Sequence, residues 1–80
     1  MDKLERFIED RCILAGDIRI RSSSLYAAYK GWAEASGEKD VMTSTTFGTK
    51  LTDRGFEKQH KEQGWTYFGI ALRGGETDGG

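Results

Sequence analysis

Two absences limit the ways in which this 80-residue chain can be stabilised or anchored. It has a single cysteine, Cys12, which cannot form a disulfide within the chain, so its stability must come from packing. It has no apolar run of about eighteen residues, so no transmembrane helix is expected. Its charged N-terminal segment also lacks the apolar stretch of a signal peptide. We therefore expect a cytoplasmic protein with no membrane partner.

The chain also lacks an excess of charge of one sign. Twelve Lys and Arg residues stand against 13 Asp and Glu, for a net charge of −1. Strong nucleic-acid binders usually carry a basic footprint, which here can only be local. Residues 41–73 hold five basic and three acidic side chains, a local balance of +2 that has the expected sign but is small.

Proline is absent as well, and the sequence shows neither an internal repeat nor a linker. Eighty residues suffice for one domain with a modest core and are too few for two. Nine aromatic residues allow dense burial for this length. The glycine-rich residues 74–80 can bury nothing. We expect one domain over residues 1–73 and a flexible tail over residues 74–80.

Apolar residues that recur three and four positions apart predict helices. The first helix is expected from Asp2 to about Ile13, with Gly16 and Asp17 ending it. The second follows the serines at 22–24, which are favoured N-cap residues, and ends before Gly37 in the C′ position. Their apolar faces comprise Leu4, Phe7, Ile8 and Cys12 in the first helix, and Leu25, Tyr26, Tyr29, Trp32 and Ala33 in the second.

A third, shorter helix is predicted after the N-cap signal Thr43-Ser44, and Gly55 stops it after Arg54. Phe47 and Leu51 lie four positions apart and can share one face towards the core. The other face is then mainly polar and exposed. It comprises Thr45, Thr46, Thr49, Lys50 and Asp53.

Alternating patterns predict three strands. Residues 18–21 form a short half-buried strand, and residues 56–61 and 65–72 form a hairpin around a turn at 62–64. In the last strand, one face is expected to carry Trp65, Tyr67 and Gly69 and the other Phe68, Ile70 and Leu72. The order helix, strand, helix, helix, hairpin predicts an α+β winged helix-turn-helix, with three helices and a small antiparallel sheet that includes the wing.

Three stretches of the chain carry a resemblance to a known module. They are FIEDRCILAGDIRIRSSSLYAAYKGWAEASGE, TTFGTKLTDRGFEKQ and WTYFGIALR. Together they resemble the C-terminal winged-helix domain of the phage/plasmid primase–helicase family, of the type also found in satellite phages and poxviruses. The resemblance implies a DNA-binding module that acts in replication and is joined in cis to a helicase domain.

Catalysis is not expected of this chain. It has no Gly-x-x-x-x-Gly-Lys-Ser/Thr phosphate loop and no acidic metal cluster, so ATP hydrolysis or primer synthesis would belong to the parent protein. Neither a nucleophile–base pair nor a carboxylate pair is evident. Cys12 and His60 cannot complete a four-ligand zinc site, and we expect a buried Cys12 and an exposed His60. No cofactor is predicted.

The exposed face of the third helix is the sharpest candidate for DNA contact. Hydroxyl groups and the N–H groups at a helix N-terminus can bind phosphate, and lysine can contact phosphate or guanine. An ordinary solvated face with capping side chains would show the same residues. The candidates are Ser44, Thr45, Thr46, Thr49 and Lys50.

The hairpin offers a second set of candidates, which suit phosphate or minor-groove contact but equally suit a solvated turn. Arg19 and Arg21 share one face of the short strand and extend the basic surface, unless they pair with nearby acids. The aromatic residues are expected in the core, with Trp65 and Tyr67 the best candidates for exposure. The hairpin candidates are Lys58, Gln59, His60 and Lys61.

Two functions remain open at this point. One is a DNA-binding accessory module that contacts duplex or single-stranded DNA through the third helix and the wing. The other is a protein-interaction or oligomerisation module of the same replication protein, because winged helices do both. Positive potential over the third helix and wing favours DNA, whereas a large apolar patch favours a protein partner.

Overall fold

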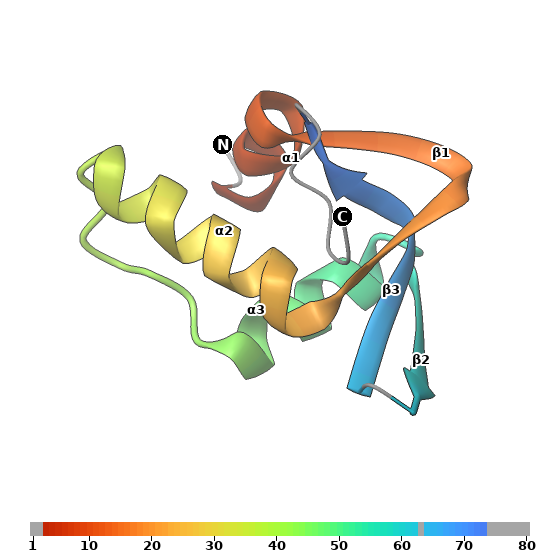
Figure 1. The fold of residues 1–80 in the computed structure, drawn as a ribbon. Helices are drawn as coiled ribbons and strands as arrows, with labels where there is room; N and C mark the ends of the chain where they lie inside the picture. Colours follow the sequence, from red (N-terminus) through yellow and green to blue (C-terminus); the bar gives the residue numbers. More distant parts are fainter. Residues whose placement is uncertain (1–2, 63, 74–80) are drawn as a thin grey trace.

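The fold is described from a computed structural model that defines residues 3–62 and 64–73. Three helices pack against one face of a three-stranded antiparallel sheet (Figure 1). The elements are α1 (Lys3–Arg11), β1 (Cys12–Arg21), α2 (Ser22–Ala35), α3 (Ser44–Asp53), β2 (Glu57–Lys61) and β3 (Gly64–Leu72). The predicted α+β class, three helices and hairpin are confirmed. The predicted tail at 74–80 lies outside the described residues.

The central strand of the sheet is β3, which pairs antiparallel with β1 on one side and with β2 on the other. The strand between the first two helices therefore joins the hairpin, as predicted. The ladder between β2 and β3 is regular from the pair Glu57↔Phe68 to the pair Lys61↔Gly64. This regular register decides which hairpin side chains share a face.

The first strand differs most from the prediction. It begins at Cys12 and has ten residues, so α1 ends at Arg11 instead of near Ile13. Gly16 and Asp17, which were expected to end the helix, lie inside β1. The sequence pattern did not predict this helix–strand boundary, because an apolar Cys-Ile-Leu run fits the end of a helix as well as the start of a strand.

A large bulge divides β1 into two paired parts. Between the pairs Leu14↔Ile70 and Arg19↔Phe68, β1 has the four residues 15–18, whereas β3 has Gly69 alone. Gly69 has a φ of +89°, a conformation that L side chains rarely adopt. The bulge resets the alternation along β3, because Tyr67, Ile70 and Leu72 are all buried. The predicted faces, with Tyr67 opposite Ile70 and Leu72, are therefore wrong.

The ends of α2 and α3 follow the predicted signals with one exception. The Thr43 side chain caps α3 and accepts a hydrogen bond from the Thr46 N–H at 3.2 Å. Gly37 and Gly55 follow the C-caps of α2 and α3 with φ values of +79° and +98°. The exception is the serine cluster at 22–24, which was expected to supply an N-cap. Because β1 continues to Arg21, the cap position falls there and the serines lie in the first turn.

Aromatic rings join the three helices in the core. Phe47 of α3 stacks on Tyr29 of α2, with ring centroids 4.9 Å apart, and packs edge-on against Phe7 of α1 at 6.2 Å. Phe47 and Leu51 are both buried, which confirms the predicted inward face of α3. The buried Trp32 indole N–H donates to the Asp10 carboxylate at 2.8 Å.

The Cys12 thiol gives a test of the α1–β1 junction. Cys12 is buried, as predicted, and burial raises its pKa from 9.0 to about 12, although the positive charge of Arg73 opposes this shift. Since the thiolate is the reactive form, we expect native protein to resist a thiol-specific aromatic disulfide near pH 8 and to react after unfolding in urea. Equally fast reaction in both states would contradict this burial.

The raised pKa of the Cys12 thiol also makes the free energy of unfolding depend on pH. The folded pKa lies above the unfolded value, so the protonated thiol favours the folded state fully below about pH 9. This contribution is lost as the pH rises from about 9 towards about 12. Urea unfolding of the wild type and Cys12→Ala across this range isolates the effect, because the variant lacks the titrating group.

Candidate nucleic-acid interface

The predicted α3 candidates are all exposed. Burial of Phe47 and Leu51 fixes the orientation of the helix, because residues on the opposite side of the helix must then face solvent. Thr45, Thr46 and Thr49 lie there and Lys50 flanks them, whereas Ser44 shares the side of Phe47 and is exposed because it begins the helix. The hydroxyl groups of these candidates differ, however, in whether they already form hydrogen bonds within the chain.

Hydrogen bonds within α3 occupy part of the hydroxyl row. The Thr49 hydroxyl donates to the Thr45 carbonyl at 3.1 Å, which uses its one proton. The Thr46 hydroxyl accepts from the Thr43 hydroxyl at 3.2 Å. The hydroxyls of Ser44 and Thr45 bond to no other group in the described part of the chain, so they are the better phosphate donors.

Two tyrosines of α2 fix the segment that leads into α3. The Tyr26 hydroxyl donates to the Met42 carbonyl at 2.8 Å, and the Met42 N–H donates to the Tyr29 hydroxyl at 3.1 Å. These bonds hold the main chain immediately before the Thr43 cap. Sequence reasoning assigned both rings to the core and missed this role. The two tyrosine hydroxyls on the otherwise apolar face of α2 could have indicated this role, since a buried tyrosine usually finds a hydrogen-bond partner.

The hairpin meets α3 at Gly48. A Cβ on Gly48 would lie 2.7 Å from the Tyr67 hydroxyl oxygen and 3.4 Å from the Lys58 Nζ. Tyr67 was a candidate for exposure, but only 2% of its surface is accessible. The bulge at Gly69 turns its ring to the helix side, where burial raises the pKa of its hydroxyl and keeps it protonated. The absence of a side chain at Gly48 therefore permits close approach of the two elements.

A hollow of about 450 Å³ opens between α2, α3 and the hairpin. Trp65, which is 49% exposed as predicted, and Lys58 line it from the hairpin. Ser44 and Thr45 line it from α3. The remaining lining residues are Ser22, Ser23, Tyr26, Phe47 and Tyr67. Among the described residues that line this hollow, Lys58 is thus the one with a charged side chain.

The register of the hairpin divides its candidates between two faces. Lys58 and His60 pair with Tyr67 and Trp65 and lie on the helix side of the sheet. Gln59 pairs with Thr66 and lies on the outer side, as does Lys61 by alternation. The structure therefore does not bring the predicted wing residues into one surface.

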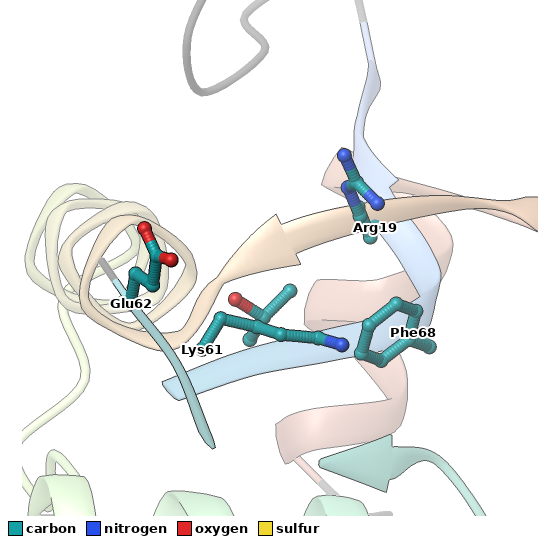
Figure 2. Close-up of a pocket in the computed structure, with 5 residues that line it drawn as sticks. Arg19, Lys61, Glu62 and Phe68 are labelled. Carbon is teal, nitrogen blue, oxygen red and sulfur yellow. The ribbon is translucent and has the colours of Figure 1, made fainter. Parts of the chain in front are cut away.

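The outer face of the sheet carries the two arginines of β1. Arg19 and Arg21 stand opposite Phe68 and Thr66. Figure 2 shows Lys61 extending towards Phe68, with its Nζ 5.6 Å from the ring centroid, and Arg19 nearby on β1. These side chains and Glu62 line a second hollow, of about 410 Å³, on the outer face, where Glu62 offsets part of the positive charge.

Residues 3–62 and 64–73 contain neither a cluster of metal ligands nor a membrane-spanning helix. No three His, Cys, Asp or Glu side chains gather there as a metal site would require. No helix in those ranges is long and apolar enough to cross a membrane.

The relationship of the chain to known proteins follows from its match to a family model. Residues 1–69 match the family described as poxvirus D5 protein-like. The chain belongs to this family. The match confirms the resemblance at family level and links this poxvirus D5-like chain to replication proteins of the primase–helicase type. A comparison with curated proteins found no match.

The contact at Gly48 gives a test of how the hairpin docks. Alanine exceeds glycine in helix propensity by about 1 kcal/mol. We nevertheless expect Gly48→Ala to lower the free energy of unfolding by about 1–3 kcal/mol, because its Cβ would overlap the buried Tyr67 hydroxyl. Urea unfolding measures the change, and the loss should shrink in a Tyr67→Phe background.

Gly31→Ala is the matched control. Gly31 also lies within a helix, but a Cβ there would meet nothing within 4 Å. This substitution should therefore stabilise the protein by up to about 1 kcal/mol. An equal stabilisation by Gly48→Ala would contradict the described packing of the hairpin on α3.

Proposed function

We propose that this chain is a non-catalytic, winged-helix DNA-binding module of a replication protein of the primase–helicase type. In this proposal α3 is the recognition helix and the β2–β3 hairpin is the wing. ATP-dependent activity belongs to a helicase domain joined in cis. The observation that carries the proposal is that Ser44 and Thr45, at the start of α3, line one hollow together with Lys58 of the hairpin.

The chemistry of this surface suits a DNA backbone. Unengaged hydroxyls at Ser44 and Thr45 and the N–H groups of the first α3 turn can donate to phosphate oxygens. Lys58 adds positive charge in the hollow, and Lys50 is exposed on α3 outside the lining of the hollow. None of the described residues that line the hollow carries a carboxylate, so the local charge is favourable although the whole chain is not basic.

The outer face of the hairpin is a weaker candidate for the same role. Lys61 and Arg19 contribute positive charge there, but the negative charge of Glu62 lines the same outer hollow. The two faces point away from each other, so one straight duplex cannot contact both equally. We therefore assign the main contact to the helix side and give Arg19, Arg21, Gln59 and Lys61 a secondary role.

Lysine substitutions on each face test this assignment. Lys50→Ala and Lys58→Ala should each weaken duplex binding and lower the slope of log affinity against log salt concentration by about one, because each removes one phosphate contact. Lys61→Ala should have a smaller effect. Salt-titrated fluorescence anisotropy with a labelled duplex measures both quantities, and thermal melting checks that the variants remain folded.

Lys39→Ala is the charge-matched control, because Lys39 is exposed in the loop that follows α2, at the opposite end of that helix from the hairpin (Figure 1). It should leave affinity and salt slope unchanged. Unchanged binding in Lys50→Ala and Lys58→Ala would remove the support for the proposed surface. An equal loss in all four variants would indicate general attraction between charges with no defined interface.

A protein-interaction module is the second candidate function, and a specific observation favours it. Ile13 and Leu14 are 43% and 58% exposed on β1, which is an edge strand of the sheet. An exposed apolar edge can pair with a strand of another chain.

Self-association through this edge has a direct test. It should make the sedimentation coefficient of the wild type rise with concentration, and Leu14→Asp should abolish that rise. A wild type that sediments as a monomer at every concentration argues against an interface between copies.

A further inference from the structure

We propose that the hollow between α2, α3 and the hairpin holds one unpaired nucleotide of a DNA strand, with its base stacked on Trp65 and its phosphate beside Lys58. The inference rests on the proposed DNA-binding function and deepens it. It assigns to the chain a preference for a duplex with a single-stranded end over a blunt duplex.

Trp65 differs from the other aromatic residues in its environment. Tyr29, Trp32, Phe47 and Tyr67 are buried, whereas the Trp65 indole is half exposed and faces the hollow. Its neighbours restrict its position, and 49% of the residue remains exposed. The His60 ring lies edge-on at 4.9 Å between centroids, with an interplanar angle of 63°. A large aromatic surface held open at the wall of a hollow is what base stacking requires.

Lys58 places a positive charge next to this aromatic surface. Its Nζ lies 5.1 Å from the Trp65 ring centroid and 5.5 Å from that of Tyr67. Within the described residues Lys58 forms no salt bridge, so a ligand would be its first ionic partner. The Ser44 and Thr45 hydroxyls line the same hollow and can donate to a phosphate held there. Aromatic and cationic groups are thus combined at one place.

The geometry favours an unpaired nucleotide over a paired one. A base inside a duplex has both faces covered by its neighbours, so it cannot stack on an indole without leaving the helix. An unpaired base at a strand end presents a free face. The hollow of about 450 Å³ lies within the usual range of about 300–1,000 Å³ for small-ligand sites.

Matched DNA ligands test the inference by fluorescence anisotropy. The ligands are a blunt duplex and the same duplex with a short 5′ or 3′ overhang. The wild type should bind at least one overhang duplex about tenfold more tightly than the blunt duplex, a ratio typical of one stacked base. Trp65→Leu should abolish this ratio, whereas Trp65→Phe should retain part of it.

Leu14→Ala is the control variant, because Leu14 is another exposed apolar residue of the sheet and does not line the hollow. It should leave the ratio intact. If Trp65→Leu loses its cooperative melting, wild-type tryptophan fluorescence replaces it as the readout. Stronger quenching by an overhang duplex than by the blunt duplex then supports the inference, and equal quenching overturns it.

The outcomes separate this inference from the function on which it rests. Blunt-duplex binding that is sensitive to Lys50→Ala, with no gain from either overhang, overturns the nucleotide site and leaves the proposed function standing. Failure to bind any DNA rejects both. Displacement of the overhang duplex by a free deoxynucleoside monophosphate at a similar concentration overturns the assignment to a DNA strand, because it identifies a site for free nucleotide.

Discussion

The stacking of Phe47 on Tyr29 is the contact on which the arrangement of α3 depends. The two rings lie nearly parallel with centroids 4.9 Å apart, and Phe7 completes the cluster from α1. This contact sets the rotation of α3 about its own axis, so the hydroxyl-bearing residues face solvent. Tyr29 also accepts from the Met42 N–H, so one side chain determines both the rotation of α3 and the path of the chain into it.

Helix ends that depend only on adjacent residues, such as a cap or a following glycine, could be predicted from the sequence. The Thr43 cap and the glycines after α2 and α3 stand where expected. The first half of β1 could not be predicted in this way, because it pairs with residues more than fifty positions away in β3. Its bulge depends on Gly69, and no pattern within residues 12–21 carries that information.

The candidate site was partly predictable for a similar reason. Exposure of the α3 row follows from the spacing of Phe47 and Leu51, and the exposure of Trp65 was anticipated. Burial of Tyr67 was not anticipated, because the side chains of the last strand were assumed to alternate between the two sheet faces without a bulge at Gly69. The division of the wing between two faces follows from the register Lys61↔Gly64, which a hairpin sequence alone does not fix.

The central position of β3 has a consequence for the order in which the protein can assemble during synthesis. Both β1 and β2 have their hydrogen-bonding partners in β3, the last strand that the structure describes. A nascent chain can form helical turns early, but it cannot close the sheet until residue 72 has left the ribosome. The Arg73 guanidinium then donates to the carbonyls of Glu9 and Cys12, which joins the residue after β3 to the end of α1 and the start of β1. Folding must therefore be completed from the C-terminal side, through contacts that are distant in the sequence and slow to form.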